Sequence, residues 1–283
     1  MSDMKALTEL SRAVALAVVL AGAPAAVLAQ SAAPAAATDP MSLARQHYNA
    51  GDYDAAIVAA TEAASRPATR SEANLLLGRS LLERHRATRT PEDLGAARQA
   101  LGGVEAATLT DRGRVDLVVG LGEALYLDGE FGPAASVLEP VLHQMGLLPP
   151  ADREQVLDWW ATAMDRHAQT RPPEERAALY DAVTDRMRGH LGRYAESSAA
   201  SYWLPAAALA RGDLDQAWDL AMASWVRALL APDRGKVLRG DLDQLVTQAL
   251  IPERVRRLSV EDDAETVAAR LVGEWEEAKG RWP

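Results

Sequence analysis

The stretch Ala50-Gly51-Asp52-Tyr53-Asp54-Ala55-Ala56-Ile57 predicts a tight turn between two helices. Glycine adopts the left-handed backbone that commonly ends a helix, and the small residues after it let a second helix lie close to the first. Related stretches begin at Gly129 and Gly212, each with an acid, a large apolar residue and then alanine. The three glycines are 78 and 83 residues apart, so each interval has room for one further, divergent helix pair.

The sequence between these turns supports five helix pairs. Apolar residues at helical spacing predict helices over 42–49, 54–65 and 115–128, and others that begin near 71, 91, 152 and 173. A fifth pair covers about 197–230, where Pro205 is expected to remove a hydrogen bond and kink the helix. Residues 85–90 read as a polar connector. Gly78, inside a helical pattern, indicates that two backbones approach closely there.

This pattern resembles the tetratricopeptide repeat, in which each unit is a pair of helices joined by a turn of glycine, an acid and an aromatic residue. The resemblance covers about 42–230 and is most specific in units one, three and five. The matching residues are Ala44, Gly51, Tyr53, Ala56, Ala63, Gly78, Ala97, Gly122, Gly129, Phe131, Ala134, Ala161, Gly212, Leu214 and Ala217. It implies an all-α solenoid of about five helical hairpins over 42–231, with an irregular helical bundle as the alternative.

Residues 232–283 are expected to form a helical cap on the last repeat. Asp241 is predicted to cap a short helix that ends before Pro252, and a last helix is predicted from about Val260, with Ser259 and Asp262 as a capping box. One face of that helix is apolar and the opposite face is polar, as a terminal cap requires. The apolar face comprises Val267, Leu271, Trp275 and Trp282.

The first 29 residues read as a secretory signal, with Lys5 and Arg12 before an apolar run and small residues ahead of Gln30. An uncleaved N-terminal anchor is the alternative. The run is shorter than a membrane span, and without cysteine there is no lipobox. Residues 30–41 then form a flexible linker. We expect a periplasmic or secreted protein with no membrane span once the signal is removed.

The net charge of −10 disfavours a nucleic-acid binder and favours a basic partner. The absence of cysteine excludes disulfides and thiol chemistry. The five histidines lack the spacing of a helical metal site, and no phosphate-binding or nucleophile motif is present. We therefore expect no catalytic, cofactor-binding or metal site, and no cofactor.

In the tetratricopeptide family the first helices of the units form a concave groove, and its lining residues can be transferred position by position. The resulting groove residues are Arg45, Tyr48, Asn49, Arg79, Glu83, Glu123, Tyr126, Asp158, Asp165 and Tyr202. Mixed charges with interspersed tyrosines suit recognition of a protein or peptide partner. A solvated inner face without a ligand is the alternative for each residue.

All seven tryptophans follow residue 158, and the adjacent Trp159 and Trp160 cannot both point into one core. They either widen the core or form an exposed partner patch. The sequence thus predicts a non-catalytic protein- or peptide-binding scaffold of the bacterial cell envelope. A structural subunit of an envelope or secretion complex, held by its outer face, is the first alternative, and an enzyme with a site in the groove is the second.

Overall fold

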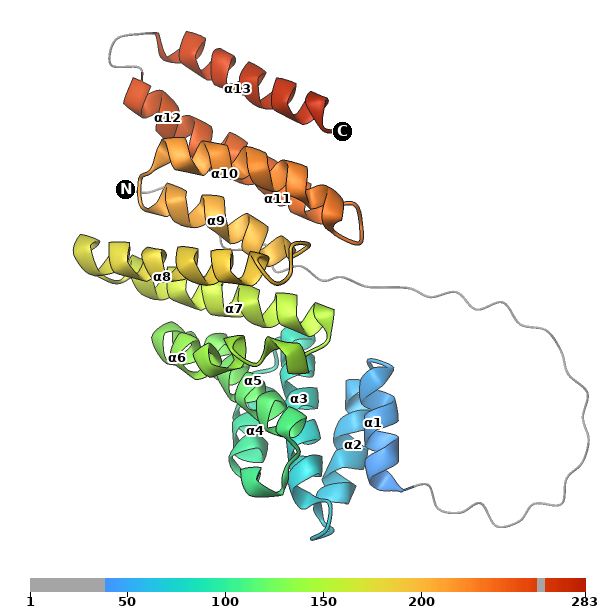
Figure 1. The fold of residues 1–283 in the computed structure, drawn as a ribbon. Coiled ribbons are helices and arrows are strands. Elements are labelled where there is room, and N and C mark those ends of the chain that lie inside the picture. Colours follow the sequence, from blue (N-terminus) through green and yellow to red (C-terminus); the bar gives the residue numbers. More distant parts are fainter. Residues whose placement is uncertain (1–38, 259–262) are drawn as a thin grey trace, which may run out of the picture. The chain divides into compact units, whose positions relative to one another are not determined.

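The computed structural model describes residues 39–258 and 263–283, and over these residues the chain forms helices and no strand (Figure 1). The predicted signal at 1–29, nearly all of the linker at 30–41 and the capping box of Ser259 and Asp262 lie outside the described residues. None of the described helices combines the length and the apolar character that crossing a membrane requires.

Five consecutive helical hairpins make up most of the chain. The hairpins are α1 (Pro40–Asn49) with α2 (Tyr53–Ala64), α3 (Arg70–Thr88) with α4 (Pro91–Gly102), α5 (Asp111–Leu127) with α6 (Phe131–Leu142), α7 (Pro150–Gln169) with α8 (Pro173–Leu191), and α9 (Ser198–Ala210) with α10 (Leu214–Arg227). Single 3₁₀ turns lie at Ala106–Thr108, Met145–Leu147 and Ala228–Leu230.

The hairpins stack in order along the chain. Each first helix packs on its own second helix and on the first helix of the next pair, from α1 on α3 to α7 on α9. Each second helix also packs on the first helix that follows it. Because the same set of contacts repeats, the predicted all-α solenoid of helical hairpins is confirmed.

The three glycine turns have the same geometry. Gly51, Gly129 and Gly212 have φ values of +75°, +80° and +78°, in the left-handed region that favours glycine. At the first turn, the amide of Asp52 donates to the carbonyl of His47 at 3.0 Å, and the amide of Gly51 donates to Tyr48 at 3.0 Å. This is a Schellman motif, which satisfies the last carbonyls of the first helix.

The acid that follows the glycine begins the second helix. The side chain of Asp52 accepts from the amide of Ala55 at 3.2 Å, and Asp213 accepts from Gln216 at 3.1 Å. One residue therefore ends the first helix with its backbone and caps the second with its carboxylate. Glu130 occupies this place in the third unit and makes no side-chain cap bond, because its longer side chain does not fit the short N-cap ring.

Small residues midway along the first helices of three units let the paired helices touch. A Cβ added at Gly122 would lie 2.6 Å from Cγ of Leu138 on α6, and one at Gly78 would lie 2.6 Å from Cγ of Leu101 on α4. Ala44 is the equivalent residue in the first unit and is fully buried. The close approach predicted from Gly78 is confirmed.

Pro205 takes the equivalent place in α9, and the helix continues through it. A proline has no amide hydrogen, so the carbonyl of Ser201, four residues earlier, loses its helical donor. The hydroxyl of Ser224, on α10, donates to that carbonyl at 2.6 Å in a buried setting. The neighbouring helix therefore compensates for the proline.

We expect Ser224→Ala to lower the free energy of unfolding by about 1 to 3 kcal/mol, because it leaves a buried carbonyl without a donor. In a Pro205→Ala background the new amide can donate to Ser201, so the same change should then cost much less. A double-mutant cycle by urea unfolding measures this coupling. Equal costs of Ser224→Ala in the two backgrounds would show that the hydroxyl does not replace the missing amide.

Two predicted boundaries differ from the structure. Helix α3 runs through residues 85–88 to Thr88, so most of the predicted connector is helical. No glycine or proline interrupts that stretch, and the helix ends only at Arg89, whose φ is +58°. His85 lies inside the helix, and its Nδ1 is 2.7 Å from the carbonyl of Thr90.

The helix predicted to begin at Asp241 and end before Pro252 starts earlier and ends later. It comprises α11 (Lys236–Leu245), a π turn (Val246–Leu250, labelled η5) and α12 (Ile251–Leu258) without a break. Asp233 begins it by accepting from the amides of Gly235 at 2.8 Å and Val237 at 3.0 Å. Pro252 directly follows the π turn, where the regular i to i−4 hydrogen-bond pattern is already interrupted.

The last helix, α13 (Ala264–Arg281), is capped by Asp263, whose carboxylate accepts from the amide of Thr266 at 3.0 Å. Val267, Leu271 and Trp275 are buried in one cluster with residues of α10 and α12, which confirms that part of the predicted apolar face. Trp282 does not belong to it, since half of its surface is exposed. It follows the last helical residue, where helical spacing no longer sets its direction.

Candidate partner-binding surface on the first helices

A chain of polar contacts links the first helices of four units. The guanidinium carbon of Arg79 on α3 lies 5.0 Å from the ring centre of Tyr48 on α1. Arg79 also lies 3.6 Å from the carboxylate of Asp116 on α5. Arg112 contacts Asp116 at 2.9 Å and reaches Asp152 on α7 at 3.1 Å.

A second set of charges gathers around Arg86. Arg79, Glu83 and Arg86 share one face of α3, since they are four and three residues apart. The Nη1 atom of Arg86 lies 3.1 Å from the carboxylate of Glu83 and 3.3 Å from that of Glu123 on α5. The Glu123 side chain is only 7% exposed, whereas that of Arg86 is 35% exposed. One arginine thus serves two carboxylates, one of them buried.

Burial changes the acidity of this set. Desolvation raises the pKa of Glu123 to about 7, with Glu83 acting in the same direction and Arg86 and Arg79 opposing it. Burial also raises the pKa of Tyr48 well above its usual range. Near neutral pH the charge of Glu123 therefore responds to changes in its surroundings.

Aromatic rings continue the surface toward α7. The guanidinium carbon of Arg86 lies 5.4 Å from the ring centre of Trp159. The ring of Tyr126 lies 6.4 Å from Trp159 and 5.7 Å from Phe131, the latter edge to face. We call seven of these residues the first-helix cluster: Tyr48, Arg79, Glu83, Arg86, Glu123, Tyr126 and Trp159.

The structure brings five of the ten predicted groove residues into this cluster. Asp158 lies beside it on α7 and accepts from the indole N–H of Trp203 on α9 at 2.9 Å. Tyr202 packs edge to face on Trp203, with ring centres 5.6 Å apart. These two residues extend the surface to the fifth unit.

The remaining groove residues lie elsewhere. Asp165 faces α8, where its carboxylate accepts from the hydroxyl of Tyr180 at 2.7 Å. Arg45 is exposed and pairs with Glu72 at 2.6 Å, and Asn49 is exposed near the end of α1. Arg45 and Asn49 are accessible, whereas Asp165 contributes to packing within its own hairpin.

Sequence reasoning missed Arg86, Asp116 and Trp159. Arg86 was assigned to a connector because no helix was expected beyond residue 84, although its spacing from Arg79 and Glu83 is helical. Trp159 and Trp160 are both buried and belong to one apolar cluster, so the prediction that they cannot both point into one core is wrong. Trp159 packs beneath Arg86.

The surface offers guanidinium groups and aromatic faces, which recognise carboxylates, peptide planes and rings. The residues that the structure describes include no group of three or more histidine or acidic side chains arranged to hold a metal ion. Comparisons with protein-family models, with curated proteins and with solved structures find no match.

Proposed function

We propose that this chain is a non-catalytic scaffold that binds a protein or peptide with its first helices. The observation that carries the proposal is the first-helix cluster, where Arg79 and Arg86 lie over the rings of Tyr48 and Trp159. Aromatic residues and arginine are the types most enriched where proteins bind each other. The side chains of Arg79, Glu83 and Arg86 are 26%, 24% and 35% exposed, so a partner can reach them.

The resemblance to the tetratricopeptide family supports the same assignment, since that family binds partners with this face. Stacked hairpins also present long surfaces of this kind in general. The apolar N-terminal run adds the proposal that the protein is exported and acts in the bacterial envelope. The acidic net charge of −10 favours a basic partner.

Affinity capture from an envelope fraction tests the proposal. The full chain is compared with a triple variant on α1 and α3, Arg45→Ala, Tyr48→Phe and Arg79→Gln, which keeps the Tyr48 ring in its packed place. A matched triple variant on the exposed side of α2, Val58→Ala, Thr61→Ala and Glu62→Ala, is the control.

We expect the α1 and α3 variant to lose specific partners at least about tenfold, as removal of one or two interface contacts does. The α2 variant should recover them as the wild type does. Equal recovery by all three proteins would refute binding through the first helices. Circular dichroism of each variant confirms that the helices remain.

A further inference from the structure

A groove lies along α7 between two second helices. Helices α6 and α8 each pack on α7, and between them lie two adjoining hollows of about 450 and 400 Å³. The hollows share Glu139, Trp160 and Met164, so they are halves of one α6–α8 groove. Small-molecule sites in proteins commonly have volumes of about 300 to 1,000 Å³.

The floor of the α6–α8 groove contains a polar group without a partner. Trp160 is 2% exposed, and its indole N–H, which is buried, has no hydrogen-bond partner. An indole N–H can only donate, so an oxygen acceptor is the group that satisfies it. Leaving such a donor buried and unpaired is costly, and native proteins rarely do so without a reason.

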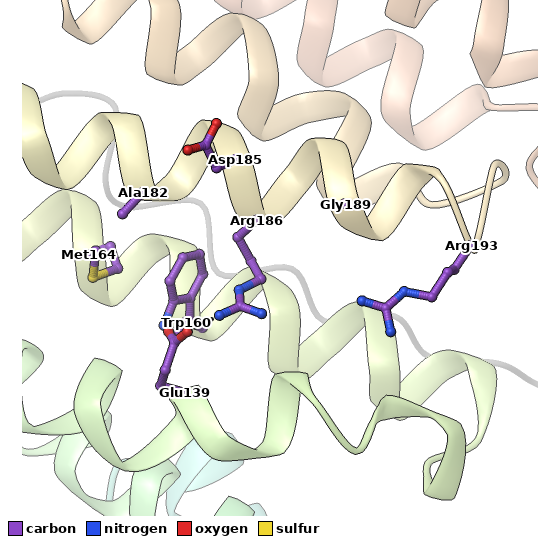
Figure 2. Close-up of a pocket in the computed structure, with 8 residues that line it drawn as sticks. All are labelled: Glu139, Trp160, Met164, Ala182, Asp185, Arg186, Gly189 and Arg193. Atoms are coloured by element: carbon purple, nitrogen blue, oxygen red, sulfur yellow. Dashed lines mark hydrogen bonds and ion pairs between the residues drawn. The ribbon is translucent and has the colours of Figure 1, made fainter.

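An ion pair covers this donor. Glu139 of α6 pairs with Arg186 of α8, and Figure 2 shows both side chains converging at the Trp160 ring. Arg193 also lines this hollow, farther from Trp160, and the carboxylate of Asp185 is directed away from Arg186 (Figure 2). Donors thus outnumber acceptors at this point, and Glu139 is the one carboxylate directed at them.

The two halves of the groove differ in polarity. The half lined by Pro133, Ala135 and Leu179 is mainly apolar, whereas the half lined by Asp185, Arg186 and Arg193 is about as polar as it is apolar. The ring of His167 lies against Gly132, whose missing side chain makes room for it. A groove with one polar half and one mainly apolar half suits a ligand with one charged end and an apolar body.

We propose that the α6–α8 groove binds a small organic carboxylate with a short apolar chain. Its carboxylate displaces Glu139 from Arg186 and also accepts from the indole N–H of Trp160, which Glu139 does not reach, and its chain lies along Met164 and Leu179. Glu139 is 39% exposed, so it can turn into solvent without a change in the backbone. In the absence of the ligand Glu139 neutralises Arg186.

Proton–nitrogen correlation spectra of the full chain test this site, with hexanoate as the probe. The seven indole N–H groups give separate signals, and Trp160→Phe identifies one by removing it. We expect hexanoate to shift that signal downfield until it saturates. Hexan-1-ol, which has the chain without the charge, and acetate, which has the charge without the chain, should leave it in place.

Two variants are expected to change the affinity for hexanoate in opposite directions. Glu139→Gln removes the competing carboxylate and should tighten hexanoate binding at least about threefold, whereas Arg186→Gln should weaken it at least about tenfold. Arg188→Gln, an exposed arginine on the same helix, is the matched control and should change nothing. The proposal is wrong if the signal does not saturate in the wild type, or if Glu139→Gln weakens binding. If Trp160→Phe does not fold, the signal is identified as the one displaced by both Glu139→Gln and Arg186→Gln.

Discussion

Replacing Trp275 by alanine is expected to lower the free energy of unfolding by about 3 to 5 kcal/mol. The side chain is fully buried, and its ring packs edge to face on Trp225 and Trp218, with centres 5.5 and 6.1 Å apart. Its indole N–H donates to Asp243 on α11 at 2.8 Å. Truncation therefore removes both the main apolar contact and one polar contact that hold α13 in place.

The same acid is held by a second residue of α13. Lys279 donates to Asp243 at 2.7 Å. Burial alone would raise the pKa of Asp243, but the bonds from Lys279 and Trp275 outweigh it and lower the pKa. In the alanine variant Lys279 alone cannot replace the lost packing, so α13 should detach before the hairpins unfold.

Urea unfolding measures the stability of the whole chain from the unfolding midpoint. Hydrogen exchange measures the protection of the α13 amides, which reports whether this helix detaches first. Trp282→Ala is the matched control, because Trp282 is half exposed and the carbonyl that it offers to Trp225 at 3.1 Å is retained. It should cost less than about 1 kcal/mol. Similar costs for the two variants would show that α13 does not depend on Trp275.

Glu123 is expected to make stability depend on pH. Its pKa is raised from 4.5 to about 7, chiefly by burial, so the folded chain holds a proton that the unfolded chain has released. Stability from this group is complete below pH 4.5 and is lost as the pH rises through 7. The loss amounts to about 3 kcal/mol.

Glu123→Gln removes the titration and keeps the shape of the side chain, while Arg86 retains Glu83. Between pH 4.5 and 8 the variant should therefore gain about 3 kcal/mol relative to the wild type. Denaturant unfolding at several pH values measures this gain. The control, Glu92→Gln, removes one charge at an exposed position of α4. If the Glu123→Gln difference does not change with pH, the carboxyl is not titrating in this range.

Much of the fold could be predicted from local signals. The turn glycines and helix-starting prolines act over a few residues, so Gly51, Gly129 and Pro91 are readable without tertiary information. The end of α3 was missed because Arg89 adopts a positive φ that glycine or asparagine usually signals. The hydrogen bond lost at Pro205 was predicted, but its replacement was not, because Ser224 lies 19 residues away in the sequence.

The candidate surface was predicted less completely, since it depends on contacts between units. The groove positions transferred from the tetratricopeptide repeat correctly predicted that Tyr48, Arg79 and Glu123 lie on one surface. The shared role of Arg86 between Glu83 and Glu123 depends on how α3 lies on α5. The α6–α8 groove had no sequence signal, because a donor without a partner is defined only by its neighbours.

The glycine turn has a consequence for engineering. In the three hairpins with a glycine turn the connection is only three residues long. The backbone of its acid takes part in the hydrogen bonds of both helices, so an insertion there breaks two helix ends at once. The connections between hairpins at 103–110 and 143–149 are longer and partly exposed. A reporter domain or epitope spliced beside Gly146 therefore leaves each hairpin intact, and chain length can vary between hairpins without affecting the stack.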